Sequence, residues 1–252
     1  MEMRKDAAGF KILLAEDNPF SQQIAVLTLQ SAGYAVDVAN TGRQVIEKWM
    51  DGKYDLILMD LEMPDIDGLE ATAAIRRMEK GKGGHIPIFA VSAHNKASHM
   101  ERCLAAGMDD YITKPIGIGD LSIKIKNFAG KAFNPGSNGV AKSLPFDLSP
   151  LRVIFSENEV RELALLFLKR GRETIREIGA AITEKDAKSL RHKAHQLKGS
   201  SSQLRAATLA SVAAKLEYLA ETGEIAGADA LFTEMKAVFE DTAKALEKDT
   251  QG

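Results

Sequence analysis

The first half of the chain alternates short apolar runs with amphipathic stretches, and this alternation constrains the fold more than any other feature. Five runs read as strands: residues 11–15, 34–38, 55–59, 86–91 and 110–113. Several are almost wholly apolar, as is typical of parallel strands that are covered on both faces. The stretches between them show helical spacing. The pattern therefore predicts an α/β doubly wound fold with a five-stranded parallel sheet.

We expect this first domain to occupy residues 10–130. A helix is expected to begin at Asn18 and Pro19, because asparagine caps helices and proline suits the first helical position.

The second half has a different pattern. Residues 131–147 are rich in Gly, Pro, Ser and Asn, which predicts a flexible linker. Over residues 148–248, apolar residues recur at intervals of three and four, with breaks near Thr183 and Gly223. This spacing predicts an all-α up-and-down helical bundle. Near its start, "SENE" (156–159) has the spacing of a capping box.

Composition excludes several classes of protein. The single cysteine, Cys103, rules out an internal disulfide framework, fits a reducing compartment and is expected to serve packing. No apolar run approaches the ~20 residues that cross a bilayer, and the N-terminus does not read as a signal peptide. The formal net charge of −2 gives no reason to expect a nucleic-acid partner. We therefore expect a cytoplasmic protein without membrane insertion.

Polar side chains follow the ends of the predicted strands. Glu16 and Asp17 follow the first strand, Asp60 the third, Ser92 the fourth and Lys114 the fifth. Open parallel sheets bind ligands at this edge. Any one of these residues could be an ordinary polar loop residue, but five at the same edge favour a site. Three close carboxylates call for a cation, all-oxygen ligands favour Mg²⁺, and Lys114 with Ser92 would face a phosphate.

Four segments, "ILLAEDN", "LILMDLEMPDIDG", "AVSAHN" and "DDYITKPI", closely resemble the flavodoxin-like receiver domain of response regulators in two-component signalling. The resemblance implies that Asp60 is the phosphoacceptor. It also implies that Glu16, Asp17 and Asp60 hold Mg²⁺ together with the backbone carbonyl of Glu62. Glu62 and His94 occupy positions that tune the hydrolytic loss of the phosphoryl group in this family.

The same resemblance assigns roles at the ends of the last two strands. Ser92 and Lys114 are expected to contact the phosphoryl group, and the Lys114–Pro115 peptide bond is expected to be cis. Tyr111 matches the aromatic switch residue, which turns inward as the hydroxyl of Ser92 follows the phosphate. The alternative for Tyr111 is ordinary packing of an aromatic ring at a strand end.

The segment "RHKAHQLKGSSSQL" (191–204) contains two of the five histidines. At 100° per residue, its leucines lie on one helix face, while His195, Lys198 and Gly199 lie on another. We therefore expect His195 to face outward beside Lys198, as a nucleophile that meets another protein. The alternative is a solvated surface histidine, to which His192 is assigned. Metal binding is disfavoured because this helix offers no nearby carboxylate or cysteine.

The segments "AHQLKGSSSQL" and "FDLSPLRVIFSENEV" resemble the histidine-containing phosphotransfer (HPt) domain. This resemblance implies that His195 is phosphorylated on a ring nitrogen, with Lys198 and Gly199 assisting access. Together, the two domains predict a phosphorelay protein that carries phosphoryl groups on Asp60 and His195. The expected partners are a sensor histidine kinase and other receiver or HPt proteins.

Three alternatives stay open. The chain could be the C-terminal receiver–HPt portion of a hybrid sensor histidine kinase, although its starting Met argues weakly for a self-contained chain. It could be a non-phosphorylated interaction module, although all five receiver groups are retained. A phosphatase with an aspartate nucleophile would want Asp-x-Asp, where this chain has Asp60-Leu61-Glu62. No nucleotide-binding region is recognised in the sequence, so we do not expect a kinase.

Overall fold

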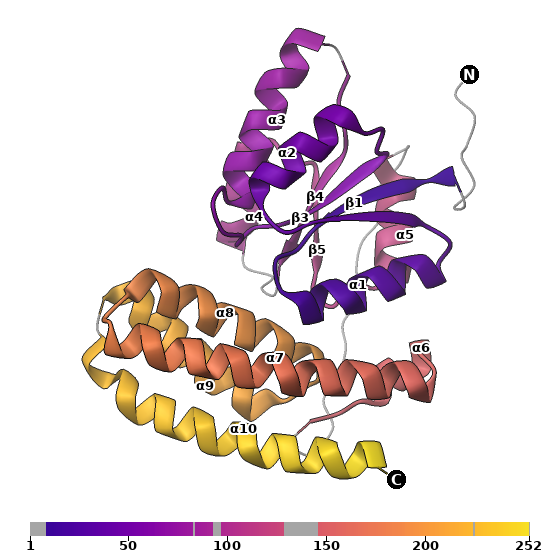
Figure 1. Cartoon of the computed structure of the whole chain (residues 1–252). Coiled ribbons are helices and arrows are strands. Elements are labelled where there is room, and N and C mark those ends of the chain that lie inside the picture. The colour runs from indigo at the N-terminus through magenta and orange to yellow at the C-terminus, as the bar shows by residue number, and fades with distance from the viewer. Residues whose placement is uncertain (1–8, 83, 93–96, 129–145, 224, 252) are drawn as a thin grey trace. The chain divides into compact units, whose positions relative to one another are not determined.

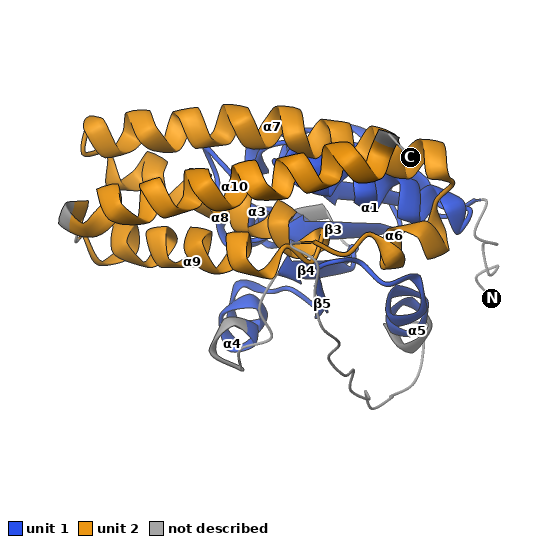
Figure 2. Ribbon diagram, turned by 90° about the horizontal axis from the view of Figure 1, so that it is seen from below, with its two compact units in different colours: residues 1–137 blue, residues 138–252 orange. Residues whose placement is uncertain are grey.

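The computed structural model describes the backbone of residues 9–82, 84–92, 97–128, 146–223 and 225–251. The chain divides into two compact units, residues 1–137 and residues 138–252, shown in blue and orange in Figure 2. Most of the predicted linker, and His94, lie outside the described residues. Among the helices that are described, none is long and apolar enough to cross a membrane.

The first unit is a five-stranded parallel sheet in the order β2-β1-β3-β4-β5, with helices on both faces (Figure 1). This confirms the predicted doubly wound fold. The strands are β1 (Lys11–Ala15), β2 (Ala35–Ala39), β3 (Leu56–Asp60), β4 (Ile88–Ser92) and β5 (Asp110–Thr113), and the helices are α1 (Pro19–Ser31), α2 (Gly42–Asp51), α3 (Gly68–Lys82), α4 (Ala97–Ala106) and α5 (Ile118–Phe128).

Three strands begin later than the sequence predicts. β2 and β3 are shifted by one residue, and β4 begins at Ile88 instead of residue 86. The late start of β4 has a physical cause: Pro87 has no N–H group, and the N–H of Ile86 donates to the Glu79 carboxylate at 2.7 Å. As a result, Asp60 and Ser92 are the last residues within their strands rather than the first residues after them.

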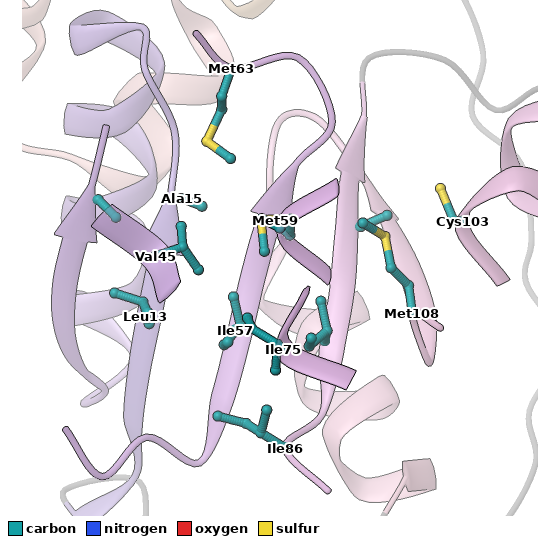
Figure 3. Close-up of a cluster of buried hydrophobic side chains, with 14 residues drawn as sticks. Leu13, Ala15, Val45, Ile57, Met59, Met63, Ile75, Ile86, Cys103 and Met108 are labelled. Atoms are coloured by element: carbon teal, nitrogen blue, oxygen red, sulfur yellow. The ribbon is translucent and has the colours of Figure 1, made fainter. Parts of the chain in front are cut away.

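Two apolar clusters hold the sheet between its helices. Helices α2, α3 and α4 cover one face, where Val45, Ile75 and Cys103 pack with the sheet residues Ile57 and Met59 (Figure 3). Helices α1 and α5 cover the other face through residues that include Leu29 and Leu121. Cys103 is buried within this cluster, which confirms its expected packing role, and burial raises the pKa of its thiol.

Helix α1 begins where the sequence predicts. The side chain of Asn18 accepts hydrogen bonds from the N–H groups of Phe20 and Ser21, at 3.0 and 3.3 Å, and Pro19 is the first helical residue. This cap fixes the direction of the chain immediately after Glu16 and Asp17.

The second unit is all-helical, as predicted. Figure 1 shows its long helices lying side by side. The capping box at Ser156 and Glu159 is present, and Gly223 ends a helix in the left-handed conformation at φ 78°. The helices are α6 (Ser149–Ile154), α7 (Glu157–Thr183), α8 (Ala187–Gln203), α9 (Ala207–Thr222) and α10 (Ala228–Gln251), with a 3₁₀ turn, η2, at Ile225–Gly227.

The last two residues of the predicted linker are held by contacts within this unit. Phe146 is buried, and the N–H of Asp147 donates to the carbonyl oxygen of Leu204 at 2.8 Å. The Asp147 carboxylate also accepts the N–H of Ser149 at 2.9 Å. The prediction of a flexible linker up to residue 147 is therefore wrong at its end, because an aromatic side chain and a backbone hydrogen bond anchor the chain there.

Helices α7 and α10 approach each other closely at two glycines. A Cβ atom at Gly171 would lie 2.4 Å from a ring carbon of Phe239, and one at Gly179 would lie 2.8 Å from a ring carbon of Phe232. Phe239 is buried and packs against Phe167, so it has little room to move aside. The small size of Gly171 therefore sets the distance between the two helices at this level.

We expect Gly171→Ala to lower the free energy of unfolding of the helical unit by about 1–2 kcal/mol, because overpacking outweighs the better helix propensity of alanine. Urea unfolding followed by helical circular dichroism would measure this. Gly199→Ala is the matched control, since nothing lies within 4 Å of the added Cβ atom. We expect that control to be as stable as the natural chain or slightly more stable. Equal unfolding midpoints for the two variants would contradict the packing argument.

Candidate functional site

The carboxyl ends of β1, β3 and β5 bring charged side chains together. Lys114 Nζ lies 2.6 Å from Glu16 Oε2 and 2.6 Å from Asp60 Oδ2. Carboxylate oxygens of Glu16, Asp17 and Asp60 all lie within 4.8 Å of one another. Glu16, Asp60 and Lys114 are almost fully buried. The structure thus joins residues from three strands that are far apart in the sequence, at the edge where the sequence analysis expected them.

The electrostatics of this cluster favour a bound cation. Burial raises the pKa of Glu16 to about 7, and the neighbouring Asp60 carboxylate adds to this rise while Lys114 opposes it. Burial alone would lower the pKa of Lys114, but Asp60 and Glu16 raise it above the ordinary value of a lysine. The cluster has three carboxyl groups beside one ammonium, so its formal charge is negative when the carboxyl groups are ionised. An all-oxygen donor set with this charge fits a hard divalent cation.

The main chain around Asp60 positions its carboxylate. The N–H of Glu62 donates to Asp60 Oδ1 at 3.3 Å, while Oδ2 faces Lys114. A Cβ atom at Gly68 would lie only 2.1 Å from the carbonyl oxygen of Asp60, so the loop can return to the start of α3 only with glycine there. Sequence reasoning missed Gly68, since the close approach depends on the path of the whole loop.

Two further predicted residues lie near these strand ends. The carbonyl oxygen of Ser92 accepts the N–H of Lys114 at 2.8 Å, which ties the end of β4 to the lysine. The Lys114–Pro115 peptide bond is cis, as predicted. Tyr111 is half-buried, packs against the apolar cluster under α2, α3 and α4, and has the Lys124 ammonium 4.7 Å from its ring centroid.

A second group of charged side chains lies in the helical unit. His195 Nδ1 is 2.7 Å from Glu217 Oε1, and Lys198 Nζ is 2.5 Å from Glu217 Oε2. Glu217 belongs to α9, whereas the other two residues belong to α8. Burial would raise the pKa of Glu217, but hydrogen bonds and attraction from His195 and Lys198 lower it to about 2. The ionised carboxylate therefore bridges the histidine and the lysine.

This bridge corrects the expected exposure of the α8 face. The Lys198 side chain is only 8% exposed and that of His195 is 16% exposed. The prediction that His195 faces outward beside Lys198 is wrong for the lysine, because the half-buried Glu217 carboxylate draws the Lys198 ammonium toward α9. Gly199, in contrast, has open space where a side chain would begin. His192 Nε2 lies 3.2 Å from the side-chain nitrogen of Gln196, one turn along the same helix.

Glu217 also determines which nitrogen of His195 carries a proton. An ionised carboxylate can only accept hydrogen bonds, so Nδ1 of His195 must donate to it. In the neutral imidazole, Nε2 is then the nitrogen that carries no proton. Sequence reasoning missed Glu217, since the contact joins residues 22 positions apart on two different helices.

The charge of Glu217 should make the stability of the helical unit depend on pH. Its pKa is lowered in the folded state, so its contribution is complete above the ordinary glutamate value of 4.5 and is lost as the pH falls toward about 2. We expect Glu217→Gln to lower the free energy of unfolding of the helical unit by about 3 kcal/mol at pH 7 and by progressively less below pH 4.5.

Urea unfolding of the natural chain and of Glu217→Gln at pH 3, 4, 5 and 7 would measure this difference. Glu221→Gln, on the exposed surface one turn along α9, is the control and should change little at any pH. A penalty for Glu217→Gln that is the same at pH 3 and pH 7 would rule out the charge as its source.

Comparison with known proteins matches both units to protein families. Residues 12–126 match the family described as the response regulator receiver domain, and residues 162–247 match the Hpt domain. "Hybrid signal transduction histidine kinase I" of Dictyostelium discoideum is 45% identical over 111 residues, which cover 42% of this chain and 6% of that protein. "Sensor protein GacS" of Pseudomonas syringae pv. syringae is 29% identical over 223 residues, which cover 83% of this chain and 24% of that protein.

The chain therefore spans a quarter or less of the length of these two relatives. Among solved structures, the receiver domain of a sensor histidine kinase from Pseudomonas aeruginosa PAO1 has a TM-score of 0.44 and 38% sequence identity. The match covers 48% of this chain and 98% of the solved chain. That solved structure holds a coordinated magnesium ion in its active-site cleft.

Proposed function

Because the chain joins a response regulator receiver domain to an Hpt domain, and so belongs to the phosphorelay proteins of two-component signalling, we propose that it accepts a phosphoryl group on Asp60 and carries one on His195. The observation that carries the proposal is the buried cluster at the strand ends, where Lys114 lies 2.6 Å from both Asp60 and Glu16. Such a cluster concentrates negative charge beside one cation, which suits the binding of Mg²⁺ and phosphate.

In the receiver, the carboxylate of Asp60 is the nucleophile. One of its oxygens bonds to phosphorus as the bond from phosphorus to the donor breaks, and the product is an acyl phosphate. The Lys114 ammonium, already beside Oδ2, stabilises the charge that develops on the phosphoryl oxygens. Glu16, Asp17, Asp60 and the carbonyl of Glu62 would hold Mg²⁺, which supplies further charge compensation when bound.

Ser92 completes the proposed phosphoryl site. Its backbone carbonyl accepts a hydrogen bond from the N–H of Lys114, so Ser92 lies where the carboxyl ends of β4 and β5 meet. We propose that its hydroxyl moves toward the phosphoryl group once Asp60 is phosphorylated and donates a hydrogen bond to a phosphoryl oxygen. The Tyr111 ring then turns inward. A serine in this position keeps the donor that the role requires.

In the Hpt domain, we propose Nε2 of His195 as the atom that bonds to phosphorus. The Nδ1–H group stays bonded to Glu217 before and after transfer, so the ring keeps its orientation. Glu217 also holds Lys198 one turn from His195, where the ammonium can balance the added negative charge. Gly199 leaves open space in which a partner can approach.

The partners that suit these two sites are a sensor histidine kinase and the receiver or Hpt domains of other relay proteins. A cytoplasmic location remains our prediction, since the proposed partners are found there and the single buried cysteine fits a reducing compartment. A chain of this kind within a longer hybrid kinase would use the same two residues, so that alternative describes the same chemistry. A non-phosphorylated interaction module would have no use for the paired carboxylates around Lys114.

The proposal is tested by incubating the full chain with acetyl phosphate and Mg²⁺ and following its intact mass. We expect a gain of one phosphoryl group that is labile to hydroxylamine, as an acyl phosphate is, and that needs Mg²⁺. The same reaction with excess EDTA is the control. A chain that gains no mass at saturating Mg²⁺ and acetyl phosphate would favour the interaction module instead.

A further inference from the structure

The side chain of Lys124 contacts two neighbouring residues of the edge strand of the sheet. Lys124 of α5 places Nζ 2.9 Å from Asp110 Oδ1 and 4.7 Å from the centroid of the Tyr111 ring. Asp110 Oδ1 also accepts the N–H of Tyr111 at 2.7 Å. Asp110 and Tyr111 lie on β5, which is the last strand in the sheet order. The Asp110 carboxylate thus accepts a backbone N–H of an edge strand and also forms an ion pair that positions the Lys124 ammonium.

The lysine is well placed to hold the ring. Its side chain is only 19% exposed, so water screens the ammonium less than it would at a fully exposed site. An ammonium over an aromatic face is attracted by the ring quadrupole, and the strength of such contacts corresponds to a bias of about two- to fivefold between two ring orientations. Tyr111 also packs against the apolar cluster under α2, α3 and α4.

We propose that Lys124 is a positioning residue for Tyr111. It holds the ring in the orientation of this structure, and loss of its charge shifts the ring toward its alternative orientation. Its consequence for the receiver rests on the proposed function. Tyr111 lies on β5, three residues before Lys114, so the orientation that Lys124 favours sets how readily the Asp60 site reaches its phosphorylated arrangement.

The first readout does not depend on phosphorylation. The full chain is labelled with 3-fluorotyrosine, which marks its four tyrosines, and Tyr111→Phe assigns the resonance of Tyr111. Without a phosphodonor, we expect Lys124→Met to move that fluorine resonance or to change the ratio of its two signals by about two- to fivefold. Lys124→Arg keeps a cation over the ring and should resemble the natural chain.

A matched control exists in the same domain. Lys11 Nζ lies 4.9 Å from the centroid of the Tyr54 ring and pairs with Asp37 at 2.8 Å. Lys11→Met removes a more exposed contact of the same kind, away from the carboxyl ends of the strands. It should move the resonance of Tyr54 and leave that of Tyr111 unchanged.

The second readout is the rate of phosphorylation by acetyl phosphate with Mg²⁺. We expect Lys124→Met to raise this rate about two- to fivefold, with Lys124→Arg and Lys11→Met near the natural rate. A Tyr111 resonance that is identical in Lys124→Met and the natural chain would overturn the inference. A moved resonance with an unchanged rate would reduce Lys124 to a structural contact. If no variant is phosphorylated, the proposed function fails, while the fluorine signal still decides whether Lys124 holds the ring.

Discussion

Asp60→Asn is expected to reduce phosphorylation of the receiver by acetyl phosphate more than about 100-fold, to below detection by intact mass. An asparagine side chain has almost the same shape as aspartate, but its amide is a poor nucleophile. It also carries no charge with which to bind Mg²⁺. No other carboxylate of the cluster can replace it, since Glu16 and Asp17 come from a different strand and are proposed to hold the metal.

The loss should not come from unfolding. Glu16 and Asp60 both lie 2.6 Å from the Lys114 ammonium, so removal of the Asp60 charge leaves the lysine paired with Glu16. It also relieves the repulsion between two buried carboxylates. We therefore expect Asp60→Asn to unfold thermally at or above the temperature of the natural chain.

Asp65→Asn is the matched control for this variant. Asp65 lies in the loop that follows β3 and pairs with Arg43 at 2.7 Å on the exposed surface. Its φ of 69° is one that asparagine tolerates well. We expect this variant to be phosphorylated at the natural rate. A mass gain in Asp60→Asn equal to that in Asp65→Asn would show that the phosphoacceptor is another residue.

Most of the first domain could be predicted from the sequence because its signals are local. Each strand is a short apolar run, and the cap at Asn18 involves neighbouring residues only. Parallel pairing then carries local information into three dimensions: residues at the ends of parallel strands must meet at one edge. That rule explains why Glu16, Asp60 and Lys114 could be expected together although they come from strands far apart in the sequence.

The helical unit was harder to predict at its site because helix faces do not reveal the neighbouring helix. Periodicity placed His195 and Lys198 away from the leucine face, which is correct for the geometry of one helix. Whether that face is exposed depends on α9, whose Glu217 buries the ammonium of Lys198. Similarly, nothing local to Gly171 indicates that Phe239, from another helix, occupies the space beside it.

The second large effect is expected from His195→Gln in a transfer between two variants of the full chain. The His195→Gln chain keeps its receiver and is phosphorylated on Asp60 with acetyl phosphate and Mg²⁺. After removal of the donor, it is mixed with the Asp60→Asn chain, which keeps only the histidine. Intact mass distinguishes the two chains. We expect the phosphoryl group to appear on the Asp60→Asn chain in an acid-labile, alkali-stable form, as phosphohistidine is.

This expectation rests on the proposed role of the His195 imidazole, whose Nδ1 is bonded to Glu217, so that Nε2 is the nitrogen proposed to bond to phosphorus. A recipient that carries both Asp60→Asn and His195→Gln should accept more than about 100-fold less phosphate. A recipient with Asp60→Asn and His192→Gln is the matched control, since His192 lies on the same helix three residues earlier. It should accept phosphate as Asp60→Asn alone does. Equal acceptance by the two doubly substituted recipients would remove His195 from the relay and leave the Hpt domain with another phosphorylated residue or none.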